Sequence, residues 1–292
     1  STPPDDASAA PTGERSLDFS TEVRGPRIPD YLKKLMEDSV QLGKTDTPVP
    51  TLAQLRRRAI EDEKRIDRVL RSEAYYNGRI SSSIRQETGG AYKVVFDVDL
   101  GERTMIESFD IVYPDHPEDE SKLPKDGAFF GLKPERAAKA QRIIDLTNET
   151  LTWLYDNGHP DAELDDRKVI VDLAAHTATV TLSIKAGEPM LFGPLAISNK
   201  GRTRDDYVRS FITFEKGKTY DRSEVDNSLN ALRKTGLFDQ MALDSGQPIN
   251  GNELPQELTL KESDARTVRL GANYTTSTGA GAKASWEHRH LL

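Results

Sequence analysis

The chain has 292 residues, a formal charge of −8 at neutral pH, 36% hydrophobic residues and no cysteine. The acidic balance argues against a nucleic acid or an anionic membrane bound through bulk charge. The lack of cysteine excludes disulfides and thiolate metal sites. No stretch approaches the roughly 20 apolar residues of a membrane helix. The modest apolar content fits several small domains better than one large core, since small domains bury a smaller share of their surface.

The N-terminal third begins with a polar, proline-bearing stretch, residues 1–14, which is typical of a disordered leader. Apolar residues then alternate with polar ones from Leu17 to Val23, which predicts a half-buried strand. A short helix is expected over 30–40. Thr51, with Gln54 three residues later, predicts the capped start of a long helix reaching about Tyr76.

A hairpin is expected next, with strands over Ile80–Gln86 and Tyr92–Leu100 around a Gly-Gly turn. Within the preceding helix, Arg56–Arg58 are followed by Glu61, Asp62 and Glu63. Alternating charge blocks of this kind indicate a solvated helix face rather than a nucleic-acid patch.

The middle third repeats this order. Its expected elements are a strand over Met105–Tyr113, a loop over 114–133 with at most a short helix, a helix opening at Pro134, and hairpin strands over Val169–Leu173 and Thr177–Lys185. The buried side of that helix is expected to carry Ala137, Ile144, Leu151 and Leu154.

The last third contains the clearest stretch, FEKGKTYDRSEVDNSLNALRKTGLF (214–238). Asp221 and Glu224 have the spacing of a capping box, and Gly236 stands where a left-handed helix cap belongs. A strand through Ile197 and a short helix at Tyr207 precede this stretch, and strands from Gln240 and from Glu257 follow it.

Three glycines mark a repeat of this pattern. AYYNGRI, LYDNGHP and LRKTGLF place Gly78, Gly158 and Gly236 at intervals of 80 and 78 residues, and we interpret all three as structural helix caps. About 80 residues is enough for a small domain with its own core.

The sequence therefore predicts an α+β protein of three tandem β-α-α-β-β domains, each a three-stranded mixed sheet packed by two helices. The predicted boundaries are 1–14 for the leader, 15–102, 103–188 and 189–265 for the domains, and 266–292 for a different C-terminal segment.

That C-terminal segment alternates without helices, over Val268–Tyr274 and again over Ala280–Trp286. Two strands of about nine residues suit a membrane β-barrel. Since two strands cannot close a barrel, we expect the segment to be the start of a truncated one.

Candidate functional groups lie on the backbone. The second strand of each unit belongs to a terminal hairpin and is our candidate sheet edge, where a partner can add a strand. The residues on these edges are Ile80, Ser82, Ile84, Val169, Val171, Met241 and Leu243.

No catalytic, cofactor or metal site is expected. The sequence lacks G-x-S-x-G and H-E-x-x-H, and its Gly279–Ala282 run lacks the lysine of a phosphate loop. His288 and His290 share a strand face, but no third ligand is close in sequence. We therefore do not expect an enzyme.

The triplicated β-α-α-β-β pattern resembles POTRA domains, the modules that precede outer-membrane barrels in bacterial assembly factors. The 214–238 stretch resembles that family's most recognisable segment, and GAGAKASWEHRHLL resembles the first barrel hairpin of the same superfamily. Three domains and the AYYNGRI form of the first repeat are most similar to the TamA family, the barrel subunits of the translocation and assembly module.

This resemblance implies a periplasmic array attached to an outer-membrane barrel in a Gram-negative bacterium. It also implies an inner-membrane TamB-like partner and clients such as autotransporters, with β-augmentation as the mode of contact. A general barrel-insertion factor, a two-partner secretion porin, and a soluble periplasmic binding or adhesion protein remain the alternatives.

Overall fold

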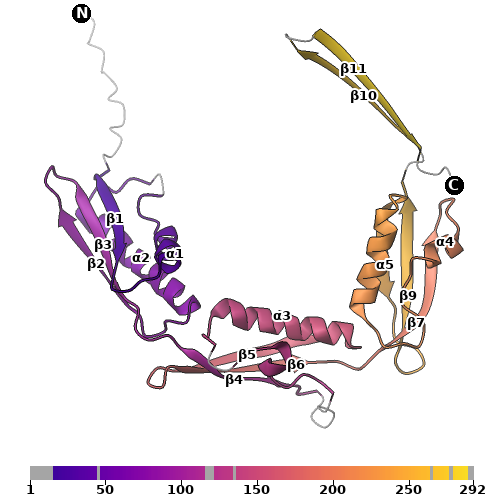
Figure 1. Cartoon of the computed structure of the whole chain (residues 1–292), viewed down its shortest axis with the longest axis horizontal. Coiled ribbons are helices and arrows are strands. Elements are labelled where there is room, and N and C mark those ends of the chain that lie inside the picture. The colour runs from indigo at the N-terminus through magenta and orange to yellow at the C-terminus, as the bar shows by residue number, and fades with distance from the viewer. Residues whose placement is uncertain are drawn as a thin grey trace, which may run out of the picture. The chain divides into compact units, whose positions relative to one another are not determined.

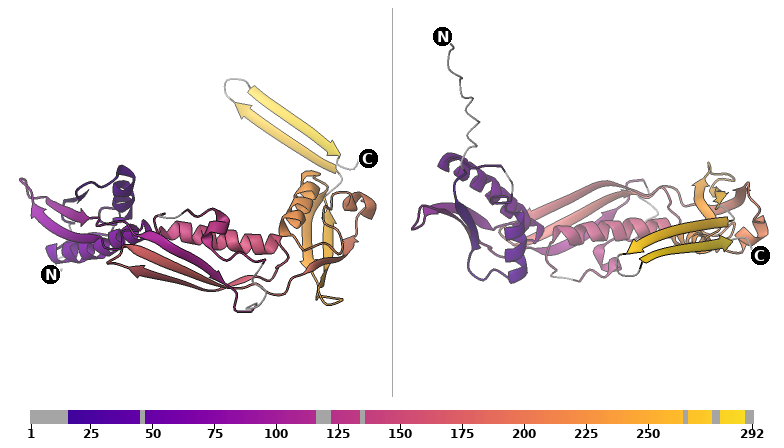
Figure 2. Two further views of the ribbon diagram at one scale, coloured as in Figure 1. Left: turned by 60° about the horizontal axis from the view of Figure 1, so that its bottom comes forward. Right: turned by 90° about the horizontal axis from the view of Figure 1, so that it is seen from above.

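A computed structural model describes residues 16–44, 47–115, 122–133 and 136–263, together with the backbone of 266–275 and 279–288. The strands form three three-stranded sheets and a separate two-stranded hairpin (Figures 1 and 2). In each three-stranded sheet, the strand that comes last in sequence lies between the other two. This confirms the predicted α+β class with three POTRA-like mixed sheets.

The first sheet has the order β1-β3-β2, formed by β1 (Phe19–Arg24), β2 (Arg79–Gln86) and β3 (Tyr92–Asp99). Strand β3 is parallel to β1 and antiparallel to β2. A parallel pair needs a crossover, and the two helices α1 (Asp30–Ser39) and α2 (Leu52–Ser72) supply it.

Both helices bury one apolar row against the first sheet. Leu32 and Met36 of α1 meet Leu55, Ile66 and Leu70 of α2 in one core cluster. The amide N–H of Gln54 donates to the Thr51 hydroxyl, as the capping pattern predicted. The long helix ends at Ser72, however, rather than near Tyr76.

The middle sheet has the order β4-β6-β5, from β4 (Met105–Val112), β5 (Glu163–Asp172) and β6 (Thr177–Lys185). A single α-helix, α3 (Ala140–Asp156), lies along it (Figure 1). A 3₁₀ turn, η1 (Gly127–Phe130), stands where the other sheets have a first helix. The strand β6 has the predicted limits.

The structure corrects several predictions for the middle sheet and its helix. Strand β5 starts at Glu163, six residues before the predicted Val169, because its first half is charged and exposed and shows no apolar alternation. The buried row of α3 is also partly shifted: Leu154 is buried as predicted, but Ile144 is exposed, whereas Ile143 and Leu146 are buried.

The shift on α3 has a simple cause. The buried side of the helix includes Thr147 and Thr150, which an apolar pattern does not count. The buried Thr147 hydroxyl has a hydrogen-bond partner within the helix, because it donates to the carbonyl of Ile143 (2.8 Å). Pro134 itself lies outside the described residues, but residues 136–139 are not helical, so α3 begins six residues after the predicted start.

The third sheet has the order β7-β9-β8, from β7 (Leu191–Asn199), β8 (Phe238–Ser245) and β9 (Glu253–Glu262). Strand β9 is parallel to β7 and antiparallel to β8. The helices are α4 (Asp205–Arg209) and α5 (Arg222–Lys234). Asp221 caps α5 by accepting from the N–H groups of Ser223 and Glu224, as predicted.

Strands β10 (Arg266–Thr275) and β11 (Gly279–His288) pair antiparallel and confirm the two C-terminal strands. By contact density the chain divides into two compact units, of which the first holds 1–111, 125–147 and 167–182 and the second holds the remainder. The predicted domain limits stay predictions. Within the described part of the chain, no helix is both long and apolar enough to cross a bilayer.

Candidate partner-binding edges

Strand β2 is an outer strand of the first sheet, so its second row of backbone groups points away from β3. One of these groups already has a partner. The amide N–H of Ser82 donates to the carboxylate of Glu63 on α2 (2.6 Å). Because orientation alternates along an antiparallel pair, the N–H groups of Ile80 and Ile84 point outward as well.

The apolar side chains on β2 are engaged in the core. Ile80 and Ile84 are half-buried and pack against the first core cluster. The β2 edge therefore offers backbone groups, one of them capped by an acid, and little free apolar surface.

Strand β5 is an outer strand of the middle sheet, and it is far more exposed than β2. Every residue from Glu163 to Ile170 is exposed. Val169, Ile170 and Leu173 have exposed fractions of 38%, 54% and 51%. Proteins normally avoid exposed apolar residues on an outer strand, because such an edge can pair with a strand of another chain. Of the predicted edge residues here, Val169 is exposed and Val171 is half-buried.

Strand β8 is an outer strand of the third sheet, with Met241 and Leu243 opposite Leu260 and Leu258 of β9. Both side chains are partly buried and pack against the core of that sheet. The structure thus places all seven predicted residues on outer strands, but on three separate sheets.

The three marker glycines do not have one common conformation. Gly158 and Gly236 have φ of +96° and +68°, the left-handed region where glycine is favoured. Gly78 is not left-handed. The left-handed residue after α2 is Ala74 (φ +72°), and the Tyr75 amide closes the helix by donating to the Leu70 carbonyl.

Gly78 has a packing role instead. A Cβ at Gly78 would lie 2.7 Å from Cδ1 of Leu70, so the position admits no side chain without movement of the core. The prediction of a helix cap at Gly78 is wrong because α2 ends about one turn earlier than expected.

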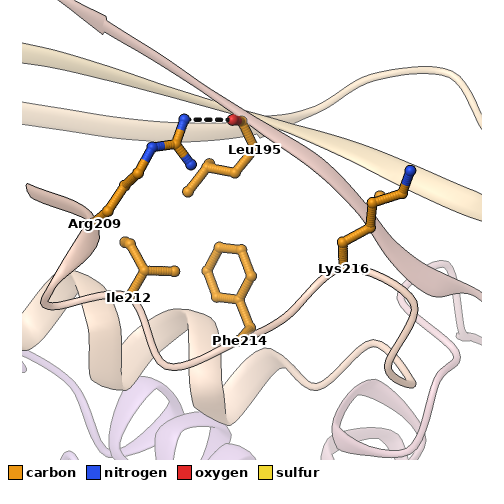
Figure 3. A pocket seen from close by; sticks show the side chains of 6 residues that line it. Leu195, Arg209, Ile212, Phe214 and Lys216 are labelled. Carbon is orange, nitrogen blue, oxygen red and sulfur yellow. Dashed lines mark hydrogen bonds between the residues drawn. The ribbon is translucent and has the colours of Figure 1, made fainter. Parts of the chain in front are cut away.

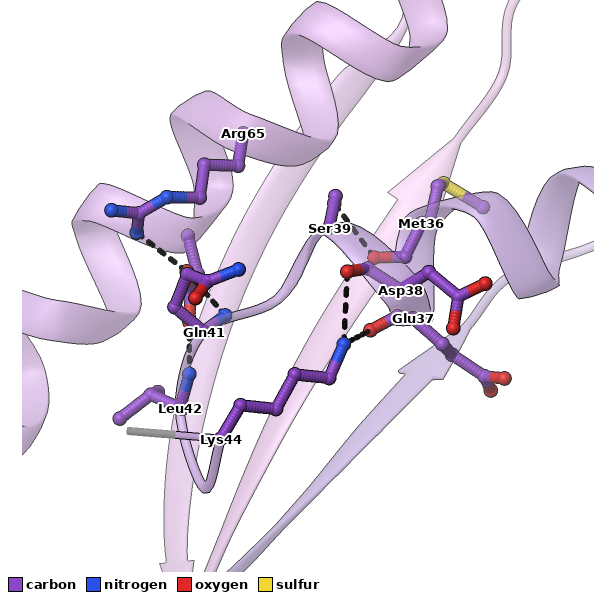
Figure 4. Close-up of polar contacts among 9 residues, drawn as sticks. Met36, Glu37, Asp38, Ser39, Gln41, Leu42, Lys44 and Arg65 are labelled. Carbon is purple, nitrogen blue, oxygen red and sulfur yellow. Dashed lines mark hydrogen bonds and ion pairs between the residues drawn. The ribbon is translucent and has the colours of Figure 1, made fainter. Parts of the chain in front are cut away.

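A buried acid anchors the loop between α1 and α2. The carboxylate of Asp62 accepts from the amides of Gln41 and Leu42 (3.0 Å each) and pairs with Arg65 (2.7 Å; Figure 4). Lys44 donates to the carbonyls of Glu37 and Asp38 at the end of α1. Asp62 is fully buried, so the interpretation of Glu61–Glu63 as a solvated charge block is wrong at this residue.

Another acid anchors the loop after β7. The carboxylate of Glu262 accepts from the amide of Thr203 (2.6 Å) and from the Asn199 side chain (3.2 Å). Burial by itself raises the pKa of Glu262, but hydrogen bonds from the Arg202 and Thr203 backbone and from the Thr203 and Asn199 side chains outweigh it and lower the pKa to about 2. A Cβ at Gly201 would collide with this carboxylate.

A small cavity of about 210 Å³ lies beside β7 (Figure 3). Leu195, Ile212 and Phe214 form its apolar side, with Arg209 and Lys216 at its rim. Arg209 donates to the Leu195 carbonyl (3.1 Å), and Lys216 pairs with Glu253 (3.4 Å). Both cations are therefore engaged in the fold.

Sequence reasoning missed Glu63, Asp62 and Glu262. Each acts on a backbone amide distant in sequence, and no local pattern distinguishes such an acid from a solvated one. In the described part of the chain, no group of three His, Asp or Glu residues is arranged to hold a metal ion. Of His288 and His290, for which no metal site is expected, His290 lies outside the described residues.

Comparison with known proteins gives a consistent but distant similarity, and no family model matches the chain. The outer membrane protein assembly factor BamA of Neisseria meningitidis serogroup B is 21% identical over 163 residues. That match covers 55% of this chain, and the chain spans about a fifth (20%) of the length of that relative.

Several solved structures match the chain with low similarity. POTRA domains 3–5 of Haemophilus influenzae BamA match with 18% identity and a TM-score of 0.45, covering 85% of this chain and 96% of theirs. Haemophilus ducreyi BamA lacking POTRA domains 1–3 matches with 16% identity and a TM-score of 0.47, covering 62% and 34%. POTRA domains 1–3 of Anabaena Omp85 match with 14% identity and a TM-score of 0.35, covering 86% and 96%.

The sheet topology and the sequence match point the same way. The chain contains three POTRA-like α+β sheets, and over about half its length it is similar to the outer membrane protein assembly factor BamA.

Proposed function

We propose that the chain is the periplasmic part of an outer-membrane protein assembly factor, in which outer strands of the sheets receive strands from other proteins. The observation that carries this proposal is the exposed outer strand β5. Unpaired main-chain groups supply affinity for an added strand, and neighbouring apolar side chains supply contact area. The mechanism is templating and positioning, without bond chemistry, nucleotide or cofactor.

A test compares two exposed isoleucines. Ile170 on β5 and Ile60 on α2 have exposed fractions of 54% and 51%, so they match in residue type and accessibility. Lysine at Ile170 should weaken capture of a urea-unfolded outer-membrane protein by at least fivefold, whereas Ile60→Lys should leave capture unchanged. Equal effects of the two substitutions would contradict binding at β5.

The finer proposal concerns the partners. The resemblance to TamA-type subunits supports a TamB-like inner-membrane partner at the β2 edge, autotransporter clients, and an outer-membrane barrel continuing from the β10–β11 hairpin. Ile84→Pro tests the partner site, because the Ile84 N–H points away from β3 and its loss leaves the ladder intact. Unchanged capture of the TamB-like protein by this folded variant would reject the β2 site.

A general barrel-insertion factor is the second candidate, and the similarity to the BamA of Neisseria meningitidis favours it. The two candidates differ in the partner retained. Immobilised chain that recovers a TamB-like protein from solubilised envelope membranes supports the first, and recovery of barrel-insertion components without that protein supports the second.

A further inference from the structure

The first compact unit contains a cavity of about 590 Å³ with an unusual lining. Its wall combines a small apolar patch with five cationic side chains, which are Arg103, Lys133, Arg136, Lys139 and Arg142. The chain as a whole carries a charge of −8, so this concentration of positive charge runs against the bulk composition. We propose that this cavity is a binding site for a phosphate-bearing anion.

Two of the five cations are held in place by one acid. Glu73 pairs with Lys139 (2.7 Å) and Arg103 (3.6 Å), and its side chain is mostly buried. Each cation also lies over an aromatic ring, Lys139 over Tyr31 (5.5 Å) and Arg103 over Tyr75 (5.3 Å). These contacts fix the two side chains at the cavity wall before any ligand arrives.

Two further cations are available to a ligand. Lys133 and Arg136 are exposed and form no ion pair with any described residue. Among the residues that the structure describes, Glu73 is the acid that pairs with cations of this wall, and its one negative charge against Arg103, Lys139, Lys133 and Arg136 leaves an excess of positive charge.

The chemistry of the lining favours phosphate. Three of the cations are arginines, whose planar fork of N–H donors matches phosphate oxygens in pairs. A cavity of this volume falls within the roughly 300–1,000 Å³ typical of small-molecule sites. An extended peptide, by contrast, is accommodated by an open edge such as β5. The cavity lies beside the start of β4, away from the proposed edges on β2, β5 and β8, and the proposal does not depend on the proposed function.

The proposal is tested with the full chain by calorimetric titration of inorganic pyrophosphate at low salt. The double variant Lys133→Glu with Arg136→Glu should bind at least tenfold more weakly, because it replaces two exposed cations of the wall by anions. The control is Arg56→Glu with Arg57→Glu, which makes the same charge change at two exposed positions of α2 and should alter binding less than twofold.

A second arm identifies the source of the phosphate. Co-sedimentation uses vesicles of phosphatidylglycerol and phosphatidylcholine, with pure phosphatidylcholine as the neutral reference. Sedimentation that needs phosphatidylglycerol and is lost in the Lys133/Arg136 variant assigns the site to a lipid headgroup. Pyrophosphate binding without sedimentation assigns it to a soluble phosphate compound.

Three results would overturn the proposal. They are no binding of either probe by the unmodified chain, equal weakening by the cavity and control variants, and tight binding of a poly-glutamate peptide in place of pyrophosphate. Hydrogen exchange of the β3 and β6 amides, in the first and the middle sheet, confirms that each variant is folded, so that lost binding reflects lost charge.

Discussion

The first and middle sheets share one strand order and differ in how their outer strands are covered. In the first sheet, α1 and α2 cover one face, the isoleucines of β2 pack into the core, and Glu63 caps the Ser82 amide. In the middle sheet, a 3₁₀ turn replaces the first helix, and β5 is exposed along nearly its whole length.

This difference shows that strand order alone does not determine how accessible an outer strand is. The shared strand order, with the last strand in the centre, makes the second strand an outer strand in both sheets. Whether another chain can reach that strand depends on the neighbouring helix and on one acidic side chain. The same strand order can therefore produce a covered outer strand, β2, and an exposed outer strand, β5, in one chain.

The largest expected effect comes from removing Asp62, which anchors the loop between the two helices that cover the first sheet. Asp62→Ala leaves the amides of Gln41 and Leu42 without acceptors and Arg65 without its partner, and should cost the first sheet about 3 kcal/mol. Native-state hydrogen exchange of the β1 and β3 amides measures this loss. The control Asp67→Ala breaks an exposed pair with Arg71 and should cost about 0.5 kcal/mol or less. Similar losses for both variants would show that Asp62 is no anchor.

The next effect extends the comparison to the third sheet, whose β7 loop is also held by an acid. The folded pKa of Glu262 is about 2, below its ordinary value of 4.5, so its contribution is complete above about pH 4.5 and disappears as the pH falls toward 2. Allowing for partial exposure, the loss should be about 2 kcal/mol.

The pH dependence is measured by hydrogen exchange of β9 between pH 5 and pH 2.5. Glu262→Gln should flatten the profile, whereas Glu257→Gln, exposed on the same strand, should leave it unchanged. An identical acid slope in both variants would assign the loss to other carboxyls.

A smaller effect concerns the end of α2, beside the first sheet, and the end of α5, beside the third sheet. Ala74 occupies a left-handed conformation, so Ala74→Gly should stabilise the first sheet by about 0.5 kcal/mol. Gly236 is left-handed with open space around it, so Gly236→Ala should destabilise the third sheet by about 1 kcal/mol. Thermal unfolding of the two variants checks the opposite signs, and equal signs would refute the assigned roles.

The smallest expected stability effect comes from removing Glu63, which should make the β2 edge more accessible, as β5 is. Glu63→Ala removes the acceptor of the Ser82 amide and should cost about 0.5 kcal/mol, because the amide is then hydrated rather than buried. Exchange of that single amide should accelerate at least tenfold, which heteronuclear NMR resolves. Glu61→Ala on the same helix turn is the matched control. Unchanged exchange at Ser82 would mean that the α2 backbone, rather than the acid, protects β2.

Local sequence patterns were sufficient for several features. The side chains of Thr51 and Asp221 cap helices as their spacing indicated, and β6 has its predicted limits, because each depends on residues close in the chain. The start of β5 and the buried row of α3 were predicted wrongly. The charged residues of β5 and the threonines of α3, one of which bonds to a carbonyl of its own helix, do not contribute to an apolar pattern.

The sequence by itself determined the threefold repeat, the α+β class and the presence of an outer second strand in each sheet, since apolar periodicity and capping chemistry act within a few residues. Only the tertiary structure decided that Asp62 is buried, that Glu63 guards β2, that β5 stands open, and that five cations converge on one cavity. These features depend on which distant segments meet, and the burial of a charged group follows from its partners rather than from its neighbours in sequence.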